Sequence, residues 1–291
     1  MKRVLVTGAQ GMLGHDIMLG LRDAELTGYS RTELDIRDKK ATREAVKDFD
    51  VVINAAAYTA VDAAETHEQA AFDINAVGPQ NLAQACNSAG ATLLHISTDY
   101  VFDGHADSPY EENSPTGPVS VYGKSKLAGE QAVLEHYAEG SVILRTSWLY
   151  GVTGSSFPRT ILTAAATRDH LDVVSDQVGQ PTWTRDVVTM MNHILEASIT
   201  QGIFHATNSG QTSWHGFATR LFELAGWDTD RVHPTTTEAF PRPAPRPSWS
   251  VLGHSAWESN NLPSPRPWGE ALDEAWELGL SVFTDGHGGI R

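Results

Sequence analysis

The sequence has little cysteine, little positive charge and no long apolar run. Cys86 is the one cysteine among 291 residues, which excludes an internal disulfide and fits a reducing compartment such as the cytoplasm. Lysine and arginine total 21 against 36 acidic residues, so the formal net charge is −15. A nucleic-acid-binding surface needs a clustered basic face, so this balance predicts no nucleic-acid partner.

Signals for membrane insertion, secretion and metal binding are missing as well. No stretch approaches the roughly 20 apolar residues of a membrane-spanning helix. The apolar strand that follows Lys2 and Arg3 is too short for the apolar region of a signal peptide. We therefore predict a cytoplasmic protein without a membrane partner. The twelve histidines include no close pair at the spacing of zinc ligands, so no metal site is predicted.

The first half of the chain alternates apolar strands with helical segments. Strands are expected in "RVLVTG", "DVVINAA", "ATLLHIST" and "GSVILRTSWLYG", and a long helix in "EQAAFDINAVGPQNLAQACNSAG" that ends at Gly90. Nearly all-apolar strands separated by helices indicate βαβ units with a parallel sheet covered on both faces. The predicted fold class is α/β: a doubly wound, Rossmann-type parallel sheet with a smaller C-terminal substrate-binding domain.

This alternation ends near Gly151, and the change of pattern suggests how the domains divide. A dinucleotide-binding domain is predicted from residues 1–150 together with 183–207. The smaller substrate domain is predicted from 151–182 and 208–281, and 282–291 is expected to be a frayed tail.

Three glycines follow the first expected strand. "VLVTGAQGMLG" places Gly8, Gly11 and Gly14 at the start of the first helix, with Met12 and Leu13 between them. Glycine permits a tight turn and close approach of the backbone to a pyrophosphate, and a helix N-terminus supplies N–H groups and partial positive charge. The segment predicts a dinucleotide site, although its G-x-x-G-x-x-G spacing differs from the broad G-x-G-x-x-G fingerprint.

Tyr122 and Lys126 stand four residues apart in "SVYGKSKLAGE", and such residues share one face of a helix. A free tyrosine has a pKa of about 10, and a neighbouring ammonium stabilises the phenolate and so lowers the pKa. The pair can serve as a catalytic acid, the tyrosine, and a lysine that lowers the pKa of that acid. Amphipathic helices also carry such pairs by chance, so the other motifs have to decide.

Several further blocks occur along the chain in a fixed order. They are "NAAAYTAVDAAE", "FDINAVGPQNLA", "ISTDYVFDG", "LRTSWLYG" and "DQVGQPTWTRDV". Together with the glycine spacing and the Tyr-x-x-x-Lys pair, they resemble the extended, sugar-nucleotide-modifying branch of the short-chain dehydrogenase/reductase superfamily. Within that branch the chain resembles the family of dTDP-4-dehydrorhamnose reductases over nearly its whole length, and the "STDYVFDG" and "RTSWLYG" blocks are the most specific.

The resemblance implies NAD(P)H-dependent reduction of the C4 ketone of dTDP-4-dehydro-L-rhamnose to dTDP-L-rhamnose. It implies that Tyr122 is the catalytic acid. It implies that Lys126 lowers the pKa of that acid and binds the nicotinamide ribose, and that Thr98 forms a hydrogen bond with the reacting oxygen. It places Thr98 and Asp99 against the sugar. The related dehydratases carry a glutamate where this chain has Tyr100, which cannot act as their carboxylate base. Dehydration is therefore disfavoured.

The sugar pocket is expected to include three more residues by the same resemblance. Trp148, in the "TSW" block, packs the deoxysugar, and Val61 and Tyr100 line the same pocket. Arg242 and Arg246 lie in a segment with five prolines between 234 and 247, which we interpret as an ordered loop near a site. They are candidate clamps for the nucleotide diphosphate, since arginine pairs with phosphate bidentately; solvated side chains are the equal alternative.

Cofactor choice depends on the end of the second strand. An acidic residue there binds the ribose of NAD, whereas arginine accommodates the extra phosphate of NADP. "GYSRTELD" offers Ser30 and Arg31 before any carboxylate, so NADPH is favoured, and NADH is the alternative hydride donor. The remaining expected cofactor contacts are Asp35 and Ile36 at the adenine, and Ala57, Tyr58 and Thr59 beside the ribose and phosphates.

Two other functions remain open from the sequence. One is another nucleotide-sugar 4-ketoreductase or epimerase of the same fold, which would share every cofactor motif. The other is a non-catalytic NADP-binding regulatory subunit, which the presence of both Tyr122 and Lys126 disfavours. The chain is expected to be a monomer or a homodimer.

Overall fold

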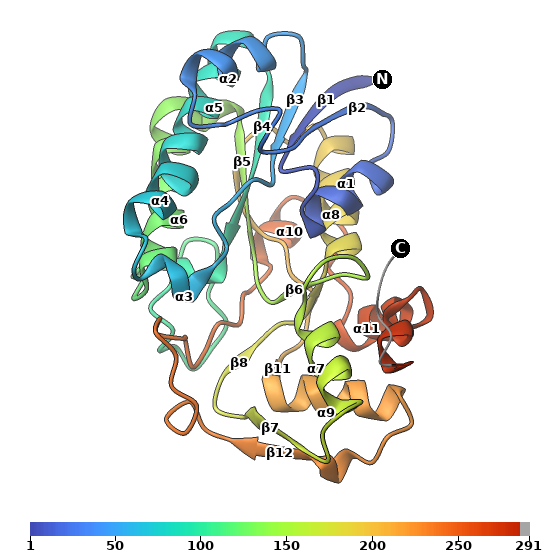
Figure 1. The fold of residues 1–291 in the computed structure, drawn as a ribbon. Coiled ribbons are helices and arrows are strands. Elements are labelled where there is room, and N and C mark those ends of the chain that lie inside the picture. Colours follow the sequence, from blue (N-terminus) through green and yellow to red (C-terminus); the bar gives the residue numbers. More distant parts are fainter. Residues whose placement is uncertain (286–291) are drawn as a thin grey trace.

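A six-stranded parallel sheet forms the centre of the computed structural model, which describes residues 1–285 (Figure 1). Its strand order is β10-β5-β4-β3-β1-β2. The strands are β1 Lys2–Thr7, β2 Ala24–Tyr29, β3 Val51–Asn54, β4 Thr92–Thr98, β5 Ser141–Thr146 and β10 Gly202–His205. After β2 the chain returns to the other side of β1, so the order reverses between β1 and β3, where open α/β sheets bind ligands. The predicted doubly wound fold is confirmed.

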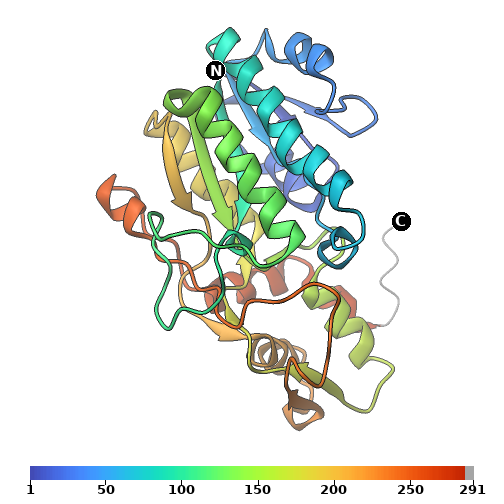
Figure 2. The same cartoon turned by 90° about the vertical axis from the view of Figure 1, so that its left-hand side faces the viewer.

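Helices cover both faces of this sheet (Figures 1 and 2). They are α1 Met12–Gly20 and α8 Thr184–Glu196 on one face, and α2 Lys39–Val46, α5 Gly78–Ala89 and α6 Val121–Tyr137 on the other. Alternate residues of β1 serve the two cores: Val4 and Val6 pack with α1 and α8, and Leu5 packs with the opposite helices. Burial on both faces explains why these strands read as continuous apolar runs.

The expected long helix before Gly90 contains a π-helical turn. It comprises α4 Glu68–Phe72, the π-turn Asp73–Val77 and α5, and it ends where Gly90 adopts the left-handed conformation. Asn75 in that turn accepts a hydrogen bond from the Tyr58 N–H at 2.8 Å and donates to the Ser125 hydroxyl at 3.0 Å. The π-turn thereby ties the segment after β3 to helix α6, and such turns are frequent at functional sites.

A second core lies below the carboxyl ends of the sheet strands (Figure 1). Its elements are β6 Leu149–Tyr150, α7 Phe157–Ala165, β7 Leu171–Val174, β8 Val178–Gly179, β9 Thr182–Trp183, β11 Thr212–Ser213, α9 Trp214–Leu224, β12 Val232–Thr235 and α11 Trp268–Glu277. The predicted division into two domains stays a prediction. Trp257 of α10, Ser255–Ser259, packs with the sheet core instead, although it lies within the range predicted for the smaller domain.

Short helical segments complete the described chain. They are α3 Val61–Ala64 and the 3₁₀ helices η2 Asp99–Val101, η3 Ala138–Gly140, η4 Thr229–Arg231 and η5 Leu280–Asp285. The expected tail of 282–291 begins too early, because η5 is ordered and Phe283 is buried in the second core. Residues 286–291 of that tail lie outside the described part. Among residues 1–285, no helix is long and apolar enough to cross a membrane.

The proline-rich segment is held by backbone hydrogen bonds. At the end of this segment, the Ser250 N–H donates to the Val178 carbonyl and the Val178 N–H donates to the Ser248 carbonyl, both at 2.8 Å. The Trp249 N–H donates to the Gly104 carbonyl at 3.1 Å. The segment is an ordered loop that connects the second core to the loop after β4.

A buried ion pair fastens α6 to the sheet. Both side chains are almost fully buried, and Arg145 of β5 donates to Glu130 of α6 at 3.0 and 2.7 Å. The Ser97 hydroxyl of β4 also donates to Glu130, and Arg145 donates to the Glu112 carbonyl at 3.1 Å. The pair therefore sets the position of α6 against two strands and one loop.

Removal of one partner of this pair should destabilise the protein, because the other charge stays buried. We expect Arg145→Met to lower the free energy of unfolding by about 3–5 kcal/mol, because the Glu130 carboxylate is left buried without its cation. Arg145→Met combined with Glu130→Leu should recover much of that loss. The measurement is urea unfolding at neutral pH.

Arg220 provides the matched control, because its pairs with Glu223 and Asp273 are partly exposed to solvent. Arg220→Met should cost at most about 1 kcal/mol. An equal loss for both single variants would contradict the special role given to the buried pair.

Candidate active site

The glycine segment forms a tight turn between β1 and α1. Gly8 has φ +71°, and a Cβ added there would lie 2.7 Å from the Ala56 backbone nitrogen. A Cβ on Gly14 would lie 2.1 Å from the Gly8 carbonyl oxygen. The Gly11 N–H donates to that same oxygen at 2.9 Å, and Gly11 caps α1 without a side-chain hydrogen bond. The first N–H groups of α1 thus stay available, and this cradle fits a pyrophosphate.

Two cavities flank this turn along the carboxyl edge of the sheet. The first, of about 490 Å³, is lined by Gly8, Gly11, Ser30, Arg31, Asp35, Ile36, Ala57, Tyr58 and Thr59 among others. The second, of about 640 Å³, is lined by Met12, Leu13, Gly14, Val61, Thr98, Asp99, Tyr100, Tyr122, Lys126 and Trp148 among others. Apart from the candidate clamps Arg242 and Arg246, the structure therefore brings every predicted site residue to one of two neighbouring cavities. Gly11 and the segment after β3 line both of them.

The charges at the end of β2 leave the first cavity with a cationic wall. The Glu33 carboxylate is turned back to the strand end, where it accepts from the Ser30 N–H at 2.8 Å and the Ser30 hydroxyl at 2.6 Å. Asp35 pairs with Arg37 at 2.6 Å, and that hydrogen bond lowers the pKa of Asp35 to about 2. Arg31 and Arg37 both line the cavity. Sequence reasoning missed Arg37, whose place depends on the turn after β2.

Tyr122 and Thr98 meet in the second cavity. The Ser120 hydroxyl accepts from the Gly123 N–H at 3.1 Å and so caps the start of α6, which places Tyr122 in its first turn, one turn before Lys126. Thr98 ends β4, and its hydroxyl donates to Asp99 at 2.9 Å. Desolvation raises the pKa of Tyr122 to about 12, although its hydrogen bond with Thr98 acts in the opposite direction. The phenol is therefore protonated at neutral pH.

Lys126 is buried one turn after Tyr122 in α6 and does not lower the pKa of Tyr122 as expected. Its ammonium donates to the Ile96 carbonyl at 2.6 Å. Burial lowers the pKa of Lys126 to about 8, and the charge of Glu130 opposes that shift. The expectation that the pKa of Tyr122 is lowered is thus wrong for the protein without ligands. Desolvation raises this pKa by more than the hydrogen bond with Thr98 lowers it. Reduction of a ketone nevertheless needs a protonated donor, and this geometry provides one.

Asp99 and Tyr100 follow Thr98 in the 3₁₀ helix η2. Asp99 is buried, and desolvation raises its pKa to about 6 against the effect of hydrogen bonds from Ser250 and Thr98. The Tyr100 ring meets the Tyr122 ring edge to face, with centroids 5.5 Å apart. These contacts hold the residues expected at the sugar directly against the residue expected to donate the proton.

Trp148 has a strained backbone in the wall of the second cavity. Its φ of +44° lies in the left-handed region, which is costly for a bulky residue and is found at functional sites. Its ring stacks on Trp214, the first residue of α9, with centroids 3.6 Å apart and planes 10° apart. Sequence reasoning missed Trp214, because only the tertiary structure brings it to Trp148.

A third cavity, of about 870 Å³, extends beyond this tryptophan pair. Trp214 and Ser155 line both it and the second cavity, and Arg242 and Arg246 also line the third. Arg246 pairs with Asp62 at 2.9 Å, and the Arg242 guanidinium lies 4.8 Å from the Phe240 ring centroid. Both arginines thus line a cavity that shares two residues with the site, and Arg242 is exposed there, so the diphosphate clamp stays a prediction.

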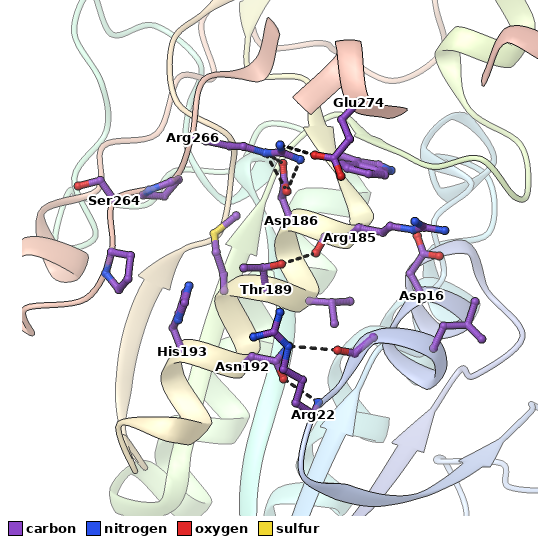
Figure 3. Close-up of a pocket in the computed structure, with 17 residues that line it drawn as sticks. Asp16, Arg22, Arg185, Asp186, Thr189, Asn192, His193, Ser264, Arg266 and Glu274 are labelled. Carbon is purple, nitrogen blue, oxygen red and sulfur yellow. Dashed lines mark hydrogen bonds and ion pairs between the residues drawn. The ribbon is translucent and has the colours of Figure 1, made fainter. Parts of the chain in front are cut away.

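A separate cleft lies between α1, α8 and the segment before α11 (Figure 3). No predicted site residue lines it. Three of its charged side chains pair with one another: Arg266 donates to Asp186 at 2.9 Å and to Glu274 at 2.6 Å. The Asn192 side chain joins α8 to the end of α1 through the Gly20 carbonyl, at 3.1 Å. We interpret this cleft as a place where helices pack, and we retain the carboxyl edge of the sheet as the candidate site.

A glycine turn at the reversal of a doubly wound sheet, beside Tyr122, Lys126 and Thr98, defines a short-chain dehydrogenase/reductase of the extended type. Comparison with known proteins narrows this class. Residues 1–279 match the family described as the RmlD substrate binding domain, and the chain belongs to this family. The resemblance seen in the sequence is confirmed.

Similar proteins carry related names. The chain is 46% identical over 282 residues to the dTDP-4-dehydrorhamnose reductase of Streptomyces griseus, covering 94% of this chain and 93% of that protein. It is also 46% identical to a probable dTDP-4,6-dihydroxy-2-methyloxan-3-one 4-ketoreductase of Streptomyces antibioticus, covering 94% of each. Among solved structures, the dTDP-4-dehydrorhamnose reductase of Bacillus anthracis in complex with NADP superposes with a TM-score of 0.92 at 36% identity, covering 95% and 99% of the two chains.

The glycine cradle makes a direct prediction about dinucleotide binding. Gly14→Ala should weaken binding of the dinucleotide by at least about tenfold, because its Cβ would press on the Gly8 carbonyl and shift the turn. Gly269→Ala in α11 is the control, since nothing lies within 4 Å of its added Cβ. Titration of NADPH fluorescence measures both. Equal affinities in the two variants would contradict the assignment of the cradle.

Proposed function

We propose that this protein reduces the C4 ketone of dTDP-4-dehydro-L-rhamnose to dTDP-L-rhamnose with NADPH as the hydride donor. The observation that carries the proposal is the meeting of Thr98, Tyr122 and Lys126 in a cavity that adjoins the glycine cradle on one side and the Trp148–Trp214 pair on the other. The names of the relatives agree with this reaction.

The residues present fit the dinucleotide. The open N-terminus of α1 would hold the pyrophosphate, and Arg31 would face a ribose 2′-phosphate at the end of β2. Asp35 and Ile36 would lie at the adenine, while Ala57, Tyr58 and Thr59 would follow the ribose and phosphates. The bound nicotinamide supplies the hydride for the ketone carbon.

Tyr122 would give its phenolic proton to the ketone oxygen as the alcohol forms. Its raised pKa keeps that proton in place at neutral pH. Thr98 donates to Asp99 and accepts from the Tyr100 N–H at 3.3 Å, which leaves its oxygen one lone pair to accept from Tyr122 or from a sugar hydroxyl. Rotation of the Thr98 hydroxyl would aim its hydrogen at the reacting oxygen.

Lys126 would bind the nicotinamide ribose with the ammonium that now donates to the Ile96 carbonyl. Its pKa of about 8 leaves it mostly charged at neutral pH. A charged lysine below Tyr122 would also stabilise the phenolate left after proton transfer, until solvent restores the proton.

The substrate would extend from the second cavity into the third. Trp148, Val61 and Tyr100 would surround the deoxysugar beside Thr98 and Asp99. The diphosphate would lie toward Arg242 and Arg246, whose cations offset the strongly negative charge of the chain. Phe240, under Arg242, adds an aromatic surface at that end.

A second candidate substrate deserves the same assay. The relative from Streptomyces antibioticus, equal in identity to the reductase from Streptomyces griseus, is named a 4-ketoreductase of a different dTDP-linked ketosugar. A panel of dTDP-4-keto-6-deoxysugars, with products identified by NMR, would separate the two. We further propose that the protein acts in the cytoplasm as a monomer or homodimer, in keeping with its single cysteine.

Loss of the Tyr122 hydroxyl should remove the proton donor and little else. Tyr122→Phe is expected to lower kcat about 10²–10⁴-fold, the usual effect of a positioned general acid, with NADPH affinity nearly unchanged. Tyr137→Phe, at the far end of the same helix, should keep wild-type turnover. Steady-state NADPH oxidation with the ketosugar panel measures both. Near-wild-type turnover of Tyr122→Phe with every substrate would exclude this assignment.

Arg31 should determine the preference between the two dinucleotides. Arg31→Asp removes a cation and adds an anion, so KM for NADPH should rise at least about tenfold relative to KM for NADH. Arg43→Asp, at an exposed position of α2, changes the net charge equally and should leave the ratio unchanged. A constant ratio in both variants would show that Arg31 does not meet the 2′-phosphate.

A further inference from the structure

The outer face of the β7–β12 pair carries three potential metal ligands. The two strands are parallel, with Asp172 paired to His233, so their side chains stand next to each other. His170 precedes Asp172 by two residues and shares its face, because side chains alternate along a strand. The opposite face is anchored in the second core by Leu171 and Val232, which fixes the backbones that carry the three ligands.

The ligand atoms already lie close together. One atom from each of His170, Asp172 and His233 lies within 4.8 Å of the other two. His170 Nε2 is 4.0 Å and His233 Nδ1 is 3.7 Å from the Asp172 carboxylate, and the two imidazole rings stack with centroids 4.7 Å apart. These separations exceed hydrogen-bonding distance, so the three groups do not use up one another's lone pairs.

Only side-chain rotations are needed to close this set around an ion. Ligand atoms bonded to a tetrahedral zinc ion at about 2.0–2.2 Å lie roughly 3.3–3.5 Å apart. Each group must therefore move by about an ångström or less, and the three side chains are free to do so because all are exposed. We propose that His170, Asp172 and His233 form a binding site for a divalent transition metal, with zinc as the best fit.

The chemistry of the three ligands selects the class of ion. Two imidazoles and one carboxylate suit zinc, copper and nickel, whereas magnesium and calcium prefer sets made only of oxygen. A fourth position remains for water. Arg231 precedes β12 but is engaged with the backbone carbonyls of Ala165, Arg168 and Asp169, so its charge is held away from the cluster by these bonds.

A bound ion would join two strands that are far apart in sequence. Strand β12 leads into the loop that carries Arg242 and Arg246, and Asp172 also lines the third cavity. The ion would therefore fix the base of that loop, about 60 residues along the chain from β7. The site itself does not depend on the proposed reaction, so its test needs no substrate.

The test uses the full-length chain without an affinity tag. Zinc is titrated in competition with a chromophoric chelator, and cobalt is added separately to record its visible absorption. The wild type should bind one equivalent of zinc more than the double variant His170→Ala/His233→Ala, and its cobalt complex should show the bands of four- or five-coordination. Asp172→Asn should weaken binding at least about tenfold, and the control His105→Ala, an exposed histidine outside the cluster, should bind like wild type.

Thermal unfolding shows whether a variant that binds no zinc is still folded. Because the three side chains are exposed, the double variant should melt at the wild-type temperature without metal. Zinc should raise the melting temperature of the wild type and not that of the variant, since an ion bound only by the folded state stabilises that state. Equal zinc stoichiometry in wild type and double variant, or no bound zinc in either, would overturn the proposal.

Discussion

The buried pair of Glu130 and Arg145 is the interaction on which the candidate site depends. Two charges removed from water are tolerated only with good geometry and further hydrogen bonds, and here Ser97 and the Glu112 carbonyl complete the set. Glu130 lies one turn beyond Lys126 on α6, so the pair that holds the helix also fixes Lys126 and, one turn earlier, Tyr122. In return for the desolvation of the two charges, the pair fixes α6 against β4, the strand that ends at Thr98.

Below this anchor, the site is assembled from segments that end at one edge of the sheet. Parallel strands bring the turn after β1, the segment after β3 and the end of β4 to the same side. The second core then supplies Trp214 and the arginine-bearing loop as the opposite wall. Desolvation between the two walls raises the pKa of Tyr122 and lowers that of Lys126. A protonated donor and a mostly charged lysine therefore coexist at neutral pH.

Much of the fold and part of the site followed from local patterns. The glycine turn, the all-apolar strands and the Tyr122–Lys126 spacing are properties of short segments, and the structure gathers them as the sequence predicts. The π-turn at Asn75 escaped prediction, because its hydrogen bonds to Tyr58 and toward Ser125 cross between segments. The frayed tail was placed too early, because Phe283 is ordered by the second core rather than by its neighbours in sequence.

By itself the sequence determined the class of fold, the glycine turn after β1, the spacing of Tyr122 and Lys126 and the cationic end of β2, because each is set by residues within one or two turns of chain. Tertiary structure decided the rest. Burial set the actual protonation of Tyr122, and packing brought Trp214 to Trp148 and Arg37 to the first cavity. It also placed His170 beside His233, although 62 residues separate them and the spacing of histidines in the sequence indicated no metal site. Desolvation and contacts between distant segments exist only once the chain has folded, so no local pattern records them.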